Sequence, residues 1–384
     1  MPLALPAPEF GADLAAAPFS VILAAMPVSQ GSVALVASWL NQYGGAERVL
    51  EVAHELFPDA PLFTSTYWPA ALPPAYRTWD IRVSFLNRLP IANQRLLLPL
   101  YPLAFESLDL TGYDRILSIT SAFAHGVRLP ERAEHVCYCL TPARFLWSYE
   151  DYVRRERIGR LPRAVLPLFI ARLREWDRRA ATRVGRFVAI SETVRQRIER
   201  YYHCESTVIF PPVHVERFAI ADGHEDFFLI LSRLVPYKRI DLAVQAFNEL
   251  GLPLIIAGDG RDRPRLEAMA KPNIRFLGRV SDDEGCELLT HCRAFIFPGD
   301  EDFGITPLEA NACGRPVIAF AGGGALDSTI EGVTGEFFRE PTGAALAETV
   351  RAFDDRKFEP RVLRRHAEQF STGVFKERLR SLWN

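Results

Sequence analysis

The chain has 384 residues, of which 48% are hydrophobic and 24% are charged. This length can bury two cores of ordinary domain size, and the composition excludes a wholly disordered chain. The formal net charge of -2 produces no global field that would attract nucleic acid or another polyanion. The six cysteines contain neither a Cys-x-x-Cys pair nor zinc-like spacing, so we expect reduced thiols in a cytoplasmic protein.

The first 32 residues are rich in alanine and proline and contain no lysine or arginine. A secretory signal carries basic residues ahead of its apolar stretch, so we expect residues 1–32 to be a disordered extension or a misplaced start. The apolar run at residues 21–26 is too short to span a bilayer, and no uncharged apolar run of about 18 residues occurs elsewhere. We therefore expect a soluble or peripheral protein.

From residue 33 to residue 212 the pattern predicts strands that alternate with helices. An apolar run at 33–38 is followed by a glycine-containing turn at 41–45 and a helix from Ala46. A strand, a glycine-rich turn and a helix form the opening of a nucleotide-binding type of unit. Further apolar runs, separated by helical stretches, follow at residues 115–119, 133–139 and 186–190.

The alternation restarts after Pro211-Pro212, which we interpret as a linker because proline stiffens the backbone. Further elements are a helix at 241–250, one or two helices at 360–383, and apolar runs at 227–232, 254–257, 274–277, 294–297 and 316–319. Because this alternation favours parallel sheets, we predict an α/β protein with two Rossmann-like, doubly wound domains facing across a cleft. Their expected bounds are 33–212 and 213–365, and we expect a C-terminal helix at 366–384 to pack back toward the first domain.

The first candidate site is cationic. Arg233 and Lys238 follow the first apolar run of the second domain, at what would be the carboxyl edge of its sheet. An arginine offers a planar fork of donors and a lysine offers a point charge, and together they suit a diphosphate. The alternative is that both are solvated surface cations.

The second candidate site is the acidic stretch 299–309, which follows another apolar run of the same sheet. Thr306 is the expected N-cap of a helix and Pro307 suits its first turn, so free N–H groups would face a bound phosphate. Glu301 in the loop could reach hydroxyl groups of a sugar, and Glu309 could hold vicinal ribose hydroxyls. The alternative is an acidic loop with a glutamate that the helix dipole favours.

Arg233…Lys238 and Glu301-x7-Glu309 resemble the donor-site signature of the retaining family-4 glycosyltransferases of the GT-B fold. The resemblance covers about residues 33–384, and it is strongest to the bacterial mannosyltransferases that build O-antigen and exopolysaccharide repeats. Other matching stretches are Tyr43-Gly44-Gly45-Ala46-Glu47-Arg48, Asp109…Tyr113-Asp114, Tyr138-Cys139-Leu140-Thr141-Pro142-Ala143-Arg144, Pro211-Pro212-Val213 and Ala257-Gly258-Asp259-Gly260.

The resemblance implies a role for each matching residue. Arg233 and Lys238 would hold the donor diphosphate, Glu301 would bind the donor sugar, and Glu309 would bind the ribose. The remaining substrate-binding candidates are the backbone of Phe303, Gly304 and Ile305 at the sugar, Gly44 and Gly45 over the phosphates and beside the acceptor, Arg279 and Val280 at the base, and also Thr306 and Arg144.

Two positions depart from the family pattern. Related enzymes often carry histidine where Leu140 stands, and the histidine that many retaining members place against the donor sugar has no clear equivalent. Ser121 and His125 are the candidates for this contact, because they follow the predicted strand at 115–119. The alternative for His125 is a histidine on the surface of a helix.

The resemblance further implies a mechanism without a protein nucleophile, a metal or another cofactor. The donor would be GDP-mannose, or alternatively a UDP-sugar, and the acceptor a saccharide or a polyprenyl-linked sugar in cell-surface polysaccharide synthesis. A non-catalytic protein that binds sugar nucleotides is a more distant alternative, and a phosphorylase shares the two-domain fold.

Two local patterns suggest other chemistry. Asp300-Glu301-Asp302 could hold a divalent metal, as carboxylate pairs do in single-domain glycosyltransferases. Gly258-Asp259-Gly260 partly matches a dinucleotide-binding fingerprint, but Arg263 occupies the position of its third glycine.

A basic stretch could also dock on a membrane. Residues 151–186 contain eleven arginines and four acidic residues, interleaved with apolar side chains, and residues 82–103 add another basic and apolar stretch. A basic amphipathic surface can bind anionic lipid, so peripheral contact with the inner face of the cell membrane is expected. The alternative is that these are ordinary solvated helix faces.

Overall fold

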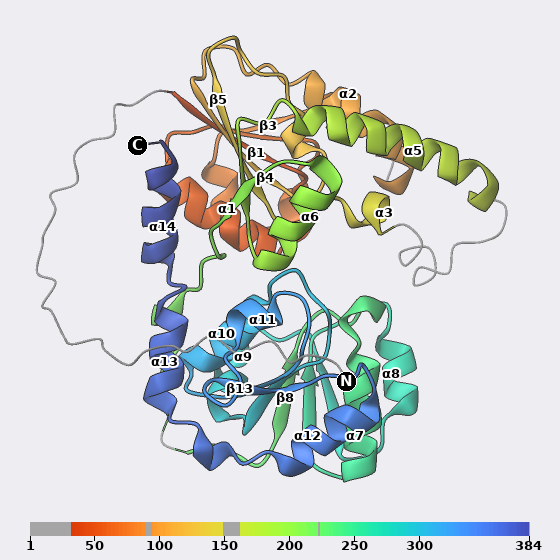
Figure 1. Ribbon diagram of the computed structural model, residues 1–384, viewed down its shortest axis with the longest axis vertical. Helices are drawn as coiled ribbons and strands as arrows, with labels where there is room; N and C mark the ends of the chain where they lie inside the picture. The colour runs from red at the N-terminus through yellow and green to blue at the C-terminus, as the bar shows by residue number, and fades with distance from the viewer. Residues whose placement is uncertain (1–31, 90–93, 149–161, 222, 384) are drawn as a thin grey trace, which may run out of the picture. The chain divides into compact units, whose positions relative to one another are not determined.

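The computed structural model describes residues 32–89, 94–148, 162–221 and 223–383, which belong to one compact unit beginning at Gly31. The expectation for residues 1–32 lies outside the described residues, apart from Ser32. Within the described residues, two separate parallel sheets form, one in each half of the chain (Figure 1). The predicted α/β class with two doubly wound sheets is thereby confirmed.

The first sheet contains, among the described residues, seven parallel strands in the order β3-β2-β1-β4-β5-β6-β7. These strands are β1 (Val33–Ala37), β2 (Leu62–Thr64), β3 (Ile81–Val83), β4 (Arg115–Thr120), β5 (Glu134–Cys139), β6 (Arg186–Ala189) and β7 (Ser206–Val208). The helices of this half are α1 (Gly45–Leu56), α2 (Tyr101–Glu106), α3 (Arg144–Trp147), α5 (Pro162–Ala181) and α6 (Glu192–Tyr202).

The second sheet contains six parallel strands in the described part of the chain, in the order β10-β9-β8-β11-β12-β13. They are β8 (Phe228–Leu231), β9 (Leu254–Ala257), β10 (Ile274–Gly278), β11 (Ala294–Phe297), β12 (Val317–Phe320) and β13 (Gly335–Phe338). Its helices are α7 (Ile240–Leu250), α8 (Arg263–Met269), α9 (Asp282–His291), α10 (Ile305–Ala312), α11 (Ala325–Ser328) and α12 (Gly343–Ala352).

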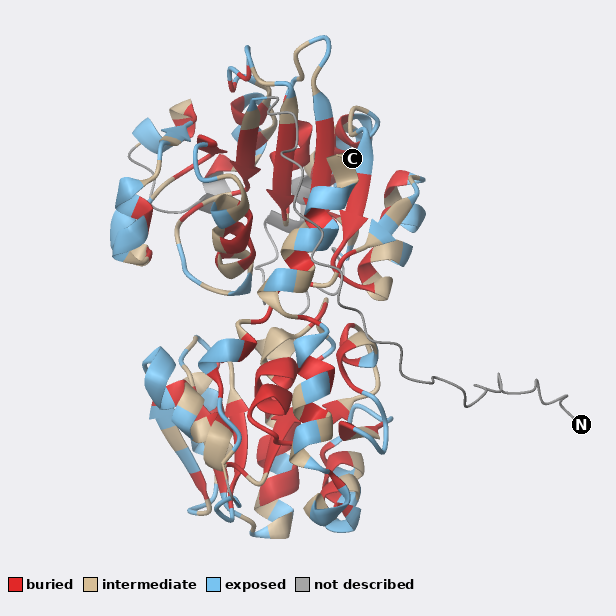
Figure 2. Cartoon of the chain, turned by 90° about the vertical axis from the view of Figure 1, so that its left-hand side faces the viewer, coloured by how far each residue is buried: buried red, intermediate tan, exposed pale blue. Residues whose placement is uncertain are grey.

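The central strands are apolar on both faces because helices cover both faces of each sheet. All four residues of β11 are buried, and Figure 2 shows the buried strands in red inside each half. Helix α7 is amphipathic, and it ends at Gly251, whose φ of 68° is the left-handed conformation that glycine adopts most easily.

The last two helices connect the two halves. The predicted helical segment at the C-terminus forms α13 (Pro360–Glu368) and α14 (Thr372–Arg380), and α14 contacts α1 of the first half (Figure 1). The Phe375 ring meets Tyr138 of β5 edge-on at 5.5 Å between centroids, and Lys376 Nζ lies 2.7 Å from Glu55 Oε2. The described end of the chain therefore packs on the first half.

The strand orders determine where a ligand can bind. The order reverses between β1 and β4 in the first sheet and between β8 and β11 in the second. In open parallel sheets, ligands bind beyond the carboxyl ends of the strands at such reversals. The loops that follow these four strands are therefore the expected components of a site.

No helix in the described part of the chain is both long enough and apolar enough to cross a bilayer.

Candidate functional site

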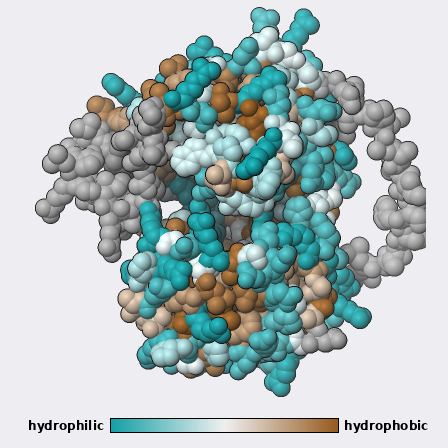
Figure 3. All heavy atoms as spheres, turned by 180° about the vertical axis from the view of Figure 1, so that it is seen from behind, coloured by the Kyte–Doolittle hydropathy of each residue, from teal (hydrophilic) through white to brown (hydrophobic). Residues whose placement is uncertain are grey.

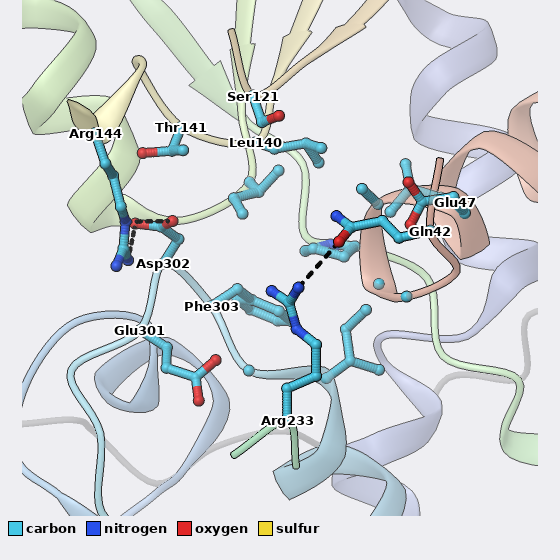
Figure 4. Close-up of a pocket in the computed structure, with 18 of the residues that line it drawn as sticks. Gln42, Glu47, Ser121, Leu140, Thr141, Arg144, Arg233, Glu301, Asp302 and Phe303 are labelled. Carbon is cyan, nitrogen blue, oxygen red and sulfur yellow. Dashed lines mark hydrogen bonds and ion pairs between the residues drawn. The ribbon is translucent and has the colours of Figure 1, made fainter. Parts of the chain in front are cut away.

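A pocket of about 670 Å³ lies at both strand-order reversals. Its walls come from the loops after β1, β4 and β5 of the first half and from those after β8 and β11 of the second (Figure 4). Hydrophilic side chains also gather between the two halves on the face drawn in Figure 3. The predicted site residues that line the pocket are Gly44, Gly45, Ser121, Arg144, Arg233, Lys238, Glu301, Phe303, Gly304, Ile305 and Thr306.

Lys238 and Glu301 form an ion pair in this pocket. The Lys238 ammonium donates to the Glu301 carboxylate, and the two side chains are only 16% and 13% exposed. Each charge of such a pair has lost most of its water, so removing either partner would leave an uncompensated, largely buried charge. An anionic ligand group that binds Lys238 would therefore compete with the Glu301 carboxylate for the ammonium group.

Arg233 reaches from the second half toward the first. Its Nη1 donates to Gln42 Oε1 at 3.1 Å, and its Nη2 donates to the Tyr237 hydroxyl at 3.2 Å (Figure 4). The Lys238 Nζ lies 5.6 Å from the centre of the Tyr237 ring. Both predicted cations therefore lie beside one tyrosine at the rim of the second sheet.

The glycines of the partial dinucleotide fingerprint support this cationic loop. A Cβ at Gly258 would lie 1.9 Å from the Ser232 carbonyl oxygen, and one at Gly260 would lie 2.3 Å from that of Leu234. Only glycine lets the two backbone segments approach this closely. These glycines are therefore needed for contact with the chain's own backbone around Arg233. The dinucleotide interpretation gains no support from them.

The helix that follows the acidic loop begins earlier than predicted. Gly304, with φ of 93°, is the N-cap, and α10 starts at Ile305, so Thr306 lies in the first turn instead of capping it. A Cβ at Gly304 would lie 2.5 Å from the Phe297 ring, so only glycine fits here. The first turn of α10 lines the pocket and places free N–H groups beside it.

Glu309 lies on α10 and is buried, with 7% of its surface exposed. Its Oε1 accepts a hydrogen bond from Arg48 Nη1 of α1 at 2.6 Å. Burial raises the pKa of the Glu309 carboxyl, and the Arg48 charge opposes that shift. The predicted ribose-binding carboxylate is therefore held by the first half, and Glu309 is not among the described residues that line the pocket.

His125 is not brought to the pocket. It is 1% exposed, and its Nε2 lies 3.3 Å from Oδ1 of the fully buried Asp177, which also accepts from Trp147 and Tyr202 at 2.8 Å. The predicted contact with the donor sugar is thus corrected, because a histidine enclosed in this way cannot meet a substrate. The alternative of a helix-surface histidine is also wrong. Ser121, the other candidate, lines the pocket.

Arg279 and Val280 follow β10 and do not line the pocket. Arg279 is exposed and Val280 is partly buried. Their contact with the base of the donor stays a prediction.

The carboxylates of the acidic loop point to different cations. Glu301 pairs with Lys238, whereas Asp302 pairs with Arg144 and Arg197. Among the described residues, no group of three or more histidine, cysteine, aspartate or glutamate side chains converges as metal ligands would.

Glu47 is a pocket residue that the sequence interpretation missed. It is 4% exposed and lies three residues after Gly44, the N-cap of α1. Burial raises the pKa of the Glu47 carboxyl to about 7, while hydrogen bonds from the N–H groups of Glu47 and Gly44, and the charge of Arg233, lower it. A glutamate at the third position of a helix is the sequence feature that could have identified this back-bonding to the N-cap.

The raised pKa of Glu47 makes stability depend on pH. Between pH 4.5 and pH 7 the folded state holds a proton that the unfolded state releases, so the stability contribution is lost as pH rises through about 7. We expect Glu47→Gln, which cannot ionise, to match the wild-type Tm at pH 5 and to exceed it by about 2 °C or more at pH 8. Calorimetric scans at both pH values measure this, and a constant Tm difference would contradict it.

Comparisons with known proteins agree with this geometry. Residues 214–370 match the family model of "Glycosyl transferases group 1". The chain is 24% identical to human alpha-1,3/1,6-mannosyltransferase ALG2 over 65% of this chain and 66% of that protein. It is 27% identical to the O-antigen chain mannosyltransferase C of Escherichia coli over 44% and 48% of the two chains. The matches span about half to two thirds of the length of these curated relatives.

A solved structure shows the same arrangement over nearly the whole chain. The crystal structure of Anabaena HepE in complex with UDP and glucose superposes with a TM-score of 0.70, at 17% identity, over 92% of this chain and 99% of that one. At this identity the likeness concerns the fold, which is the two-sheet architecture called GT-B.

Proposed function

We propose that the chain is a retaining hexosyltransferase that moves mannose from GDP-mannose to a saccharide or lipid-linked acceptor, because residues 214–370 match the family model of the group 1 glycosyl transferases. One observation carries this proposal. Arg233, Lys238, Glu301 and the first turn of α10 line one pocket at the carboxyl ends of the strands. The mannosyl donor is supported by the relatives named as mannosyltransferases, and the same relatives support a role in making glycans such as cell-surface polysaccharide.

The proposed mechanism is electrostatic and needs no metal and no other cofactor. The bond between the anomeric carbon and the diphosphate oxygen breaks, and the acceptor oxygen bonds to that carbon on the same face. The acceptor proton moves to an oxygen of the leaving diphosphate. Arg233, Lys238 and the N-terminus of α10 would stabilise the charge that grows on that leaving group.

A UDP-sugar-dependent transferase of the same fold is the second candidate. It is favoured by the likeness to HepE, which was solved with UDP and glucose. The pocket itself does not distinguish the two donors, because its described side chains address phosphate and sugar groups. A non-catalytic sugar-nucleotide-binding protein would keep the pocket but show no transfer.

A donor screen by thermal shift tests the proposal. GDP-mannose at about 100 times its dissociation constant should stabilise the folded state by about 2.7 kcal/mol, whereas a nucleotide sugar that does not bind leaves the Tm unchanged. Release of GDP in the presence of acceptor then establishes transfer. Stabilisation by UDP-sugars alone would replace the mannosyl donor by the second candidate, and no response to any nucleotide sugar would contradict the proposed function.

Cytoplasmic, peripheral contact with an anionic membrane is a further part of the proposal. Part of the basic stretch, residues 151–161, lies outside the described residues. In the described part, Leu168 and Leu103 are 64% and 58% exposed, which supports an apolar contact, whereas Arg174 and Arg178 lie over the Trp147 ring. We expect flotation with anionic liposomes at low salt and release at high salt. Absence of flotation at low salt would contradict this part.

A further inference from the structure

Three charged side chains in the pocket wall join the two halves of the chain. Asp302, from the loop after β11, is bound by Arg144 of α3 and by Arg197 of α6. Arg144 makes a forked contact, with Nε 3.0 Å from Oδ2 and Nη2 2.6 Å from Oδ1, and Arg197 Nη1 also donates to Oδ1. Figure 4 shows Arg144 pointing down from the first half onto Asp302.

This contact has the features of a strong ion pair. The side chains of Arg144, Arg197 and Asp302 are 31%, 24% and 20% exposed, so all three are largely removed from water. A forked arginine–carboxylate contact fixes orientation as well as distance. Surface pairs are weak because water and salt screen them, whereas a partly buried pair with two arginines on one carboxylate is screened much less.

Asp302 occupies a particular place in the chain. It directly follows Glu301, the proposed contact of the donor sugar, and it precedes Phe303 and the N-cap of α10. Within its own half, this loop is held by the Gly324 N–H, which donates to the Glu301 carbonyl at 2.9 Å. A Cβ at Gly324 would lie 2.1 Å from the Cα of Phe303, so the two segments are in tight contact. The loop is therefore held by backbone contacts within the second half and by two arginines from the first half.

The two arginines differ in what else they touch. The Arg144 guanidinium carbon lies 5.4 Å from the centre of the Tyr237 ring, which Lys238 also approaches. Arg197 reaches Thr141 Oγ1 at 3.4 Å and has no such contact with the cationic loop. A substitution of Arg197 therefore removes an ion pair from Asp302 without disturbing the surroundings of Lys238.

We propose that Asp302 is a positioning residue, which Arg144 and Arg197 hold so that Glu301 is correctly placed only when the two halves are joined. This inference rests on the proposed function and adds a coupling between the first half of the chain and the loop after β11 that carries Glu301. Asp302 acts through Glu301 and does not itself bind the donor. A misplacement of about 1 Å in a reacting geometry can cost about 10²-fold in rate, so a modest shift of this loop is sufficient.

A double-mutant cycle with Asp302→Asn and Arg197→Met tests the proposal. Each single variant should lower kcat for transfer by between about tenfold and 10²-fold while leaving the dissociation constant for the nucleoside diphosphate within about threefold of the wild type. Because both variants break the same contact, the double variant should be little worse than the worse single one. Arg197→Lys, which keeps a positive charge that can donate to Asp302, should recover most of the rate.

A matched control removes another ion pair between the halves. Glu55 and Lys376 join α1 to α14 outside the pocket, so Glu55→Gln should leave kcat unchanged. If the loss of kcat in the double variant equals the product of the two single losses, the positioning role is overturned. It is also overturned if Glu55→Gln lowers both Tm and kcat, because the loss of kcat would then follow the loss of stability. The wild type is assayed first with the donor found in the screen. Wild-type transfer with unaffected variants would refute this inference alone, whereas no wild-type transfer with any donor would refute the proposed function.

Discussion

Replacing Lys238 with alanine is expected to lower the turnover of sugar transfer by about 10²–10³-fold, the loss typical when one preorganised donor to a developing oxyanion is removed. Lys238 is 16% exposed and lies in the pocket beside the start of α10. Among the residues that the structure describes, no other lysine lines this pocket. Its loss also leaves the Glu301 carboxylate without its cation, which further disfavours a diphosphate nearby.

The measurement is kcat with a saturating nucleotide-sugar donor, together with Tm as a check of folding. Lys376→Ala is the matched control, because Lys376 also forms an ion pair but lies outside the pocket. We expect the control to keep wild-type turnover. Near wild-type turnover in Lys238→Ala would contradict the assignment of the phosphate site.

Replacing Glu301 with alanine is expected to lower kcat/KM for transfer by about 10²-fold, because a hydrogen bond to a charged group contributes about 1.5–3 kcal/mol. This prediction separates two roles for the same carboxylate. If Glu301 binds the sugar, Glu301→Ala lowers kcat/KM for transfer. The nucleoside diphosphate carries no transferable sugar, so it should bind this variant at least as tightly as the wild type. Loss of the Glu301 carboxylate, which competes with the diphosphate for Lys238, favours tighter binding of the nucleoside diphosphate.

Calorimetric titration with the nucleoside diphosphate provides the second half of this test. Glu301→Gln is the companion variant, because it keeps the shape and one acceptor while removing the charge. A parallel loss of diphosphate affinity and transfer in Glu301→Ala would contradict a sugar contact and would leave Glu301 as a support for Lys238.

The core of both sheets could be predicted from the sequence, whereas the shortest strands could not. The apolar runs at β9 and β11 are predicted with the bounds that the structure shows, because four consecutive apolar residues between polar turns are a clear pattern. Strands β2, β3 and β7 were missed because three residues are too few to show an alternation. Strand β13 was missed as well, and it lies at the edge of its sheet.

The residues of the candidate site could be predicted from their positions in the chain, but the ion pairs that they form could not. Arg233, Lys238 and Glu301 could be predicted because each follows a strand end, and parallel strands end at one edge. The pairing of Arg48 with Glu309 joins residues 261 positions apart, and that of Arg144 with Asp302 joins residues 158 apart. No local pattern carries such contacts.

His125 illustrates the opposite error. Its place shortly after β4 suggested a substrate contact, but its environment depends on Asp177 of α5, which lies 52 residues further along the chain. The ring is enclosed by Trp176 and Tyr202, with centroids at 6.2 and 5.6 Å. Burial by distant aromatic residues could not be predicted from the residues next to His125.

A crystal structure with the nucleoside diphosphate of the donor selected in the screen tests the central claim most directly. We predict that the diphosphate contacts Arg233, Lys238 and the first turn of α10, that the Lys238–Glu301 pair opens, and that the ribose hydroxyls reach Glu309. A nucleotide bound away from α10, with Lys238 still paired to Glu301, would contradict the account.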